Sequence, residues 1–175
     1  MKILAARKYV SPRVRPLTPD EAETRRLSYA LKAGTTESVW TAAEEMAPLI
    51  LENDVILSAI PTSYGDHGPN RKLANRIADH IRARGGRARV IVTVGRMNPV
   101  ESSCARRRRG LCGLAIEDHA LTRICGPLPA VALYFIDNVT TTGNTLRAAR
   151  AALGYGDAVC FADASTRRNQ QEPRP

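Results

Sequence analysis

The sequence predicts an α/β fold, in which an open, mostly parallel sheet of four to five strands has helices on both faces. Short runs of branched apolar residues, typical of buried parallel strands, occupy residues 55–60, 90–94, 131–136 and 158–162. Residues 2–10 form a further strand or an extended arm. Segments with helical spacing separate the runs. Because strands that alternate with helices form right-handed βαβ units, we expect the strands to lie parallel in one sheet.

Helices are predicted for residues 19–32, 36–50, 69–84 and 145–153. The first of them begins with a capping box, because Thr18 precedes Pro19 and Glu21 follows at the third helical position. It should end at Gly34. Pro48 predicts a break late in the second helix. In that second helix, we expect Trp40 to be a core residue.

Composition indicates one globular domain with anionic partners. A chain of 175 residues is typical of a single domain. Its net charge of +9 favours nucleic acid, a phosphorylated small molecule or an acidic surface as partner. The four cysteines have no zinc-like spacing and are expected to be free thiols in a reducing cytoplasm. No apolar run approaches the length of a membrane span, so we expect a cytoplasmic protein without membrane contact.

The segment 136–145 carries the strongest chemical signal. In a parallel sheet, ligands bind beyond the carboxyl ends of the strands. Asp137 stands at such a strand end, a run of threonines follows, and Gly143 opens a helix. Backbone N–H groups at a helix start bind anions, and threonine hydroxyls add donors. A carboxylate suits sugar hydroxyls or a metal beside a phosphate. The pattern therefore predicts a site for a phosphorylated sugar.

This segment resembles the phosphoribosyl pyrophosphate (PRPP) motif of the type I phosphoribosyltransferases, an apolar run followed by D-D-V-x-T-T-G-x-T. The matching residues are Asp137, Val139, Thr141, Thr142, Gly143 and Thr145. The resemblance covers about residues 25–165 and is closest to the ComF-like branch. Residues 27–34 are similar to that branch's A-L-K-Y-x-G segment, and Gly68-Pro69-Asn70 stands where the branch has G-F-N.

The resemblance implies a role for each part of the chain. Residues 1–50 would form a hood over the acceptor and residues 51–165 the phosphoribosyltransferase-like core. The polar composition of residues 166–175, which end in Pro-Arg-Pro, separately predicts a disordered tail. Asp137, with Asn138 beside it, would be catalytic, and Asp137 would also contact Mg²⁺ and the ribose hydroxyls. The implied substrate-binding residues are Thr141, Thr142, Gly143, Asn144 and Thr145 for the 5′-phosphate, Pro61, Thr62 and Ser63 for the pyrophosphate, and Arg107 in a flexible loop spanning 96–113.

Two departures from the family motif bear on activity. Asn138 stands where the family has a second acidic residue, which weakens the contact with ribose and metal. Thr141 stands where enzymes acting on 6-oxopurines carry an aspartate, so salvage of hypoxanthine or guanine is not expected.

Three functions follow, in order of preference. The first is transfer of a phosphoribosyl group from PRPP to an unidentified nitrogen acceptor. The second is a non-catalytic, nucleotide-binding regulatory protein or a ComF-like protein associated with DNA uptake. The third is binding of nucleic acid through the arginines at 106–109 and 167–168. A homodimer is compatible with each of them.

Overall fold

The computed structural model describes residues 1–11, 15–101, 105–106, 109–112 and 114–164. Arg107 of the predicted flexible loop, Cys104 and the predicted tail 166–175 lie outside these ranges. The remaining predicted site residues all lie within them.

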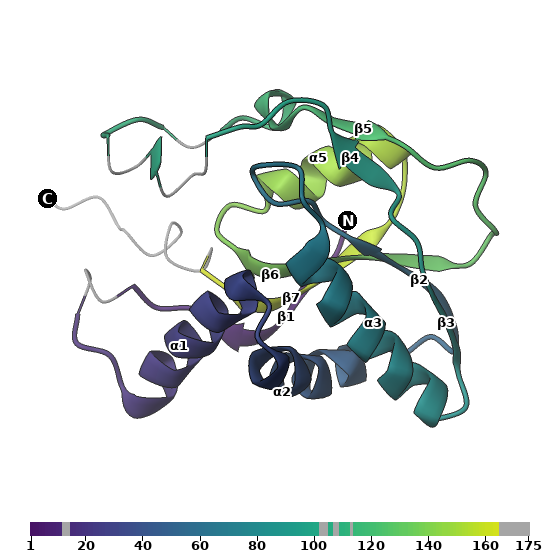
Figure 1. The fold of residues 1–175 in the computed structure, drawn as a ribbon, viewed down its shortest axis with the longest axis horizontal. Coiled ribbons are helices and arrows are strands. Elements are labelled where there is room, and N and C mark those ends of the chain that lie inside the picture. The colour runs from purple at the N-terminus through teal and green to yellow at the C-terminus, as the bar shows by residue number, and fades with distance from the viewer. Residues whose placement is uncertain (12–14, 102–104, 107–108, 113, 165–175) are drawn as a thin grey trace, which may run out of the picture.

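The core of the fold is one sheet of five parallel strands, which confirms the predicted class (Figure 1). Its strands are β1 (Ile3–Lys8), β2 (Asp54–Ala59), β3 (Arg87–Val90), β6 (Ala132–Thr140) and β7 (Asp157–Asp163). They lie side by side in the order β1-β7-β6-β2-β3, and every neighbouring pair is parallel. The N-terminal segment is therefore an edge strand of this sheet.

Helices cover both faces of the sheet, as predicted. The helices α1 (Pro19–Ala33), α2 (Thr36–Met46) and α3 (Gly68–Ala83) lie on one face, while α5 (Asn144–Leu153) lies on the other (Figure 1). The side chains of β6 alternate accordingly, because Tyr134 and Ile136 pack under α1 to α3 whereas Leu133 and Phe135 pack under α5. The predicted hood, residues 1–50, thus supplies one strand and two helices to the same core. Within the described ranges, no helix is long and apolar enough to cross a bilayer.

The predicted strand 90–94 is wrong in its position. Ile91 still donates its amide to the backbone of β2, but the amide of Thr93 bonds instead to the hydroxyl oxygen of Ser58 (3.2 Å). The ladder with β2 therefore stops, and the chain leaves the main sheet. A separate strand, β4 (Val94–Arg96), then pairs antiparallel with β5 (Leu121–Arg123).

The second helix also differs from the prediction. It ends at Met46, and a 3₁₀ turn, η1 (Ala47–Leu49), contains Pro48, so the predicted break is confirmed. Trp40 is not a core residue, since 54% of its surface is exposed. The buried stripe of α2 runs through Val39 and Met46 at helical spacing, and Trp40 lies beside it. The guanidinium of Arg76 stacks over the indole at 3.6 Å.

The start of α1 is stabilised by the predicted capping box. Glu21 donates its amide to the hydroxyl oxygen of Thr18 (3.3 Å), and the Glu21 carboxylate accepts from the Thr18 amide (3.0 Å). We expect Thr18→Ala to lower the free energy of unfolding by about 1 kcal/mol. For a domain of this size, thermal unfolding should then show a melting temperature lower by about 2 to 4 °C.

Thr41→Ala is the matched control, because the Thr41 hydroxyl bonds a carbonyl inside a helix (3.1 Å) and caps nothing. Its melting temperature should stay at or slightly above the wild-type value. Equal losses for the two variants would contradict a stabilising cap at Thr18.

Candidate functional site

The candidate site lies where β6 extends beyond the end of the neighbouring strand β2. β2 ends at Ala59, but β6 continues beyond the opposing Ile136. Asn70, in the first turn of α3, fills the gap that this leaves beside β6. Its buried side-chain amide donates to the carbonyl of Ile60 (2.9 Å) and to Oδ1 of Asp137 (3.2 Å). The amide of Asn70 therefore fixes the predicted catalytic carboxylate against the end of β2.

Asp137 has an unusual electrostatic environment. It keeps some exposed surface, but protein surrounds the carboxyl group closely enough for burial to raise its pKa. The backbone amide of Asn138 (2.8 Å) and the side chain of Asn70 lower the pKa, and the charges of Lys32 and Arg96 lower it further. Burial is the largest of these effects, so the folded protein holds a proton on Asp137 more tightly than the unfolded chain does.

The predicted phosphate loop turns sharply into α5. Gly143 has a φ of 73°, and a Cβ there would lie 2.9 Å from a methyl carbon of Ile3, so the turn requires glycine. The Thr142 hydroxyl accepts from the amide of Asn144 (3.3 Å). Arg147 donates to the carbonyl of Thr142 (2.5 Å), which places a cation beside the loop. Helical N–H groups, hydroxyls and a guanidinium thus meet at one place, as anion binding requires.

Backbone hydrogen bonds stabilise the predicted pyrophosphate loop, residues 61–63. The amide of Thr62 donates to the carbonyl of Asp66 (2.7 Å), and the carbonyl of Thr62 accepts from Gly65 (3.0 Å). That carbonyl also accepts from Nε of Arg96 (3.0 Å). The loop is therefore tied to the end of β4 by a cationic side chain.

Arg96 connects this loop to the start of α5. Its guanidinium also donates to the backbone carbonyl of His119, whose ring Nδ1 lies 3.4 Å from Oγ1 of Thr145. Burial lowers the pKa of Arg96, while the charge of Asp137 raises it. Burial lowers the pKa of His119 as well, the Arg96 charge adds to this effect, and Asp118 opposes it. A partly buried cation thus lies among three of the predicted site segments.

Asn138 has a local partner. Its side-chain oxygen accepts from the backbone amide of Val139 (2.6 Å), next along the chain. An aspartate could accept the same hydrogen bond, because both side chains present an oxygen at this position. The structure thus gives the asparagine no role that an acidic residue could not fill.

The residues fit Mg²⁺ only when a substrate supplies further ligands. Among the described residues, no three His, Cys, Asp or Glu side chains gather as a metal cage. Asp137 offers one carboxylate, and Thr141 and Thr142 follow it along the chain. Proteins commonly bind Mg²⁺ through one or two carboxylates together with substrate phosphates. The site therefore suits a metal that arrives with a phosphorylated ligand.

The arginine-rich run shows internal partners where it is described. Nε of Arg106 donates to the carbonyl of Cys112 (2.8 Å), and Arg109 pairs with Glu101. The predicted pyrophosphate contact of Arg107 stays a prediction.

The structure brings Asp137, Asn138, the 141–145 loop and the 61–63 loop to one edge of the sheet. Sequence reasoning missed His119 and Arg147, which help to hold this edge together, and it placed Arg96 only at the start of the predicted flexible loop, whereas Arg96 ends the strand β4. Asn70 was noted only as part of a motif. The sequence could have indicated Arg147 as a residue of the phosphate loop, because it lies one turn into the helix that Gly143 opens. His119 gave no such signal, since its partners lie far along the chain.

Asp137→Asn should stabilise the protein at neutral pH. The raised pKa means that the wild type loses stability as pH rises from the ordinary carboxyl range, near 4, through the folded-state pKa. A neutral amide avoids this loss and keeps an oxygen for the bonds from Asn70 and Asn138. We expect a gain on the order of 1 kcal/mol at pH 7, or about 2 to 4 °C in the melting temperature.

The difference between variant and wild type should shrink toward pH 4, where Asp137 takes up a proton. Melting curves across this range provide the measurement. A variant that is less stable than the wild type at pH 7 would show that ionisation of the buried Asp137 carboxyl does not destabilise the folded protein.

Comparisons of the chain with protein-family models, curated proteins and solved structures return no match. The family resemblance therefore depends on the residues quoted from the sequence and on their arrangement at the edge of the sheet.

Proposed function

We propose that the chain binds PRPP at this edge of the sheet and transfers its phosphoribosyl group to a nitrogen acceptor, releasing pyrophosphate. One observation carries the proposal. Asp137 lies in the last part of β6, and the strand is followed by a hydroxyl-rich loop that turns at Gly143 into the start of α5. This order supports a sugar-binding group next to a phosphate-binding group, as a ribose 5-phosphate would require.

In the proposed reaction, the C1–O bond to pyrophosphate breaks and its electron pair leaves with the pyrophosphate. The acceptor nitrogen forms the new bond to C1 and releases a proton to solvent. Positive charge develops on the ribose ring, and fixed electrostatic groups stabilise it. Asp137 would hold the ribose hydroxyls, the 141–145 loop the 5′-phosphate, and Arg96 the leaving pyrophosphate beside the 61–63 loop. Mg²⁺ would neutralise charge on the pyrophosphate when it is bound.

A non-catalytic phosphoribosyl-binding or nucleotide-binding protein is the second candidate. Asn138 favours it, because the site holds one carboxylate where the family motif has two. Binding of the 5′-phosphate does not need the second carboxylate, whereas stabilisation of a cationic transition state would gain from it.

PRPP binding is the first test. Calorimetric titration of PRPP into the wild type should show Mg²⁺-dependent binding. Asp137→Ala should weaken it by about tenfold or more, because it removes a charged hydrogen-bond partner of the ribose.

Trp40→Leu is the control, since Trp40 is exposed on α2, outside the edge just described. It should leave the affinity unchanged. If PRPP, ribose 5-phosphate and nucleoside monophosphates all fail to bind, neither candidate function survives.

Asn138→Asp separates the two candidates. If the site is catalytic, the added carboxylate should raise pyrophosphate release in the presence of an acceptor by about tenfold, through stronger contact with the ribose and metal. Tighter PRPP binding without any release across an acceptor panel would instead favour the regulatory protein. Coupled detection of pyrophosphate measures both outcomes.

A further inference from the structure

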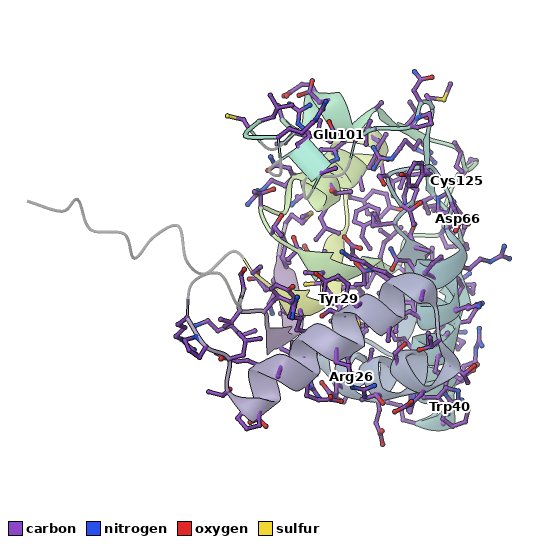
Figure 2. The ribbon with its side chains drawn as sticks, turned by 60° about the vertical axis from the view of Figure 1, so that its left-hand side comes forward. Arg26, Tyr29, Trp40, Asp66, Glu101 and Cys125 are labelled. Atoms are coloured by element: carbon purple, nitrogen blue, oxygen red, sulfur yellow. The ribbon has the colours of Figure 1, made fainter. Side chains whose placement is uncertain are left out.

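An exposed aromatic ring with two cations lies on α1. Tyr29 keeps 53% of its surface exposed. The guanidinium carbon of Arg25 lies 5.4 Å from the centre of its ring, and Nζ of Lys32 lies 5.7 Å from it. Figure 2 shows Tyr29 between α1 and the strands, whereas Trp40 lies at the far edge of the molecule. We call Arg25, Tyr29 and Lys32 the α1 cluster.

The α1 cluster lies at the same edge of the sheet as the candidate site. Tyr9 follows directly after β1, and its amide donates to the carbonyl of Asp163 at the end of β7 (2.8 Å). Burial raises the pKa of the Tyr9 phenol, Tyr29 raises it further, and Arg25 lowers it. The three side chains therefore meet just beyond the carboxyl ends of β1 and β7.

Lys32 connects the α1 cluster to Asp137. Its charge lowers the pKa of that carboxyl group, as the charge of Arg96 does from the other side of the site. Lys32 is exposed and follows Tyr29 by one helical turn, so both present their side chains to the same region of solvent. The end of α1 also lies near the site, because a Cβ on Gly34 would be 3.7 Å from Cα of Pro69, which precedes the Asn70 that bonds Asp137.

The side chains of the α1 cluster favour binding of a small molecule with a flat ring and a negative charge. An exposed phenol ring offers an apolar surface to another ring, and a guanidinium and an ammonium offer charged donors to a carboxylate. Trp40 provides a contrast. Its ring is covered by a single cation, Arg76, whose charge already pairs with Asp79 (3.8 Å).

We propose that the α1 cluster binds the acceptor, and that the acceptor is a nitrogen-containing aromatic acid. Its carboxylate meets Arg25 and Lys32, its ring contacts the exposed part of Tyr29, and its nitrogen forms the bond to C1. The identity of the acceptor rests on the proposed function, whereas the binding of an aromatic acid to the α1 cluster does not.

The experiment uses two matched pairs of probes, orotate with uracil and anthranilate with aniline. Within each pair the ring is the same and only one member carries a carboxylate. Each probe is titrated into the full chain, with and without PRPP and Mg²⁺. At least one acid should bind about tenfold more tightly than its uncharged partner, as expected for a charged hydrogen bond.

Substitutions assign this binding to the α1 cluster. Lys32→Met and Tyr29→Leu should each weaken acid binding by about tenfold, while Tyr29→Phe, which keeps the ring, should retain most of it. Trp40→Leu is the control for loss of an exposed aromatic side chain and should change nothing. Tyr29→Leu should also leave PRPP affinity within about twofold.

The outcomes separate the two proposals. PRPP binding without binding of either acid overturns the inference and leaves the proposed function standing. Acid binding that depends on Lys32 and Tyr29, without PRPP binding, keeps the inference as a binding site and refutes the proposed function. Equal affinity for acid and uncharged partner, or acid binding unaffected by Lys32→Met and by both Tyr29 variants, overturns the inference.

Discussion

The site depends on a single buried side-chain amide. Asn70 donates to the backbone carbonyl of Ile60, the residue directly after β2, and to the carboxylate of Asp137 on β6 at the same time. A buried amide must satisfy its donors, so this contact holds the start of α3 against both strands. Asn70 therefore joins the start of the 61–63 loop to the predicted ribose site, beside the backbone bond from Ile60 to Ile136. Because Pro69 precedes it in the first turn of α3, the helix begins at a fixed point relative to both strands.

In the protein without ligand, this arrangement costs electrostatic free energy. Burial raises the pKa of Asp137 and lowers that of Arg96, so each group is desolvated, and each partly offsets the cost to the other. A ligand that carries both hydroxyls and phosphates would give each group a closer partner. Sites of this kind lose stability in exchange for binding, which is a common feature of functional regions.

The sequence could predict what depends on local order. Most strands, the helices, the capping box at Thr18 and the turn at Gly143 into α5 follow from neighbouring residues. The predicted strand 131–136 is too short, because β6 continues through Asp137 to Thr140 in its pairing with β7. The end of the ladder at residue 91 could not be predicted, since it depends on a hydrogen bond between Ser58 and Thr93. The positions of Arg96 and His119 depend in turn on the β4–β5 pairing, which joins segments far apart in the chain. Trp40 shows a different failure, because the buried stripe of α2 runs through Val39 and Met46 and passes beside it.

The strand order gives the proposed reaction a direction. The 61–63 loop follows β2, Asp137 lies on the adjacent β6, and the α1 cluster lies beyond β7 and β1 on the opposite side of β6. A nucleophile that displaces pyrophosphate approaches C1 from the side opposite to the leaving group. With the ribose over β6 and the pyrophosphate over β2, the approach comes from β7 and β1, where Tyr29 and Lys32 lie. In the proposed reaction, the leaving group, the ribose and the acceptor would thus occupy successive positions along one edge of the sheet.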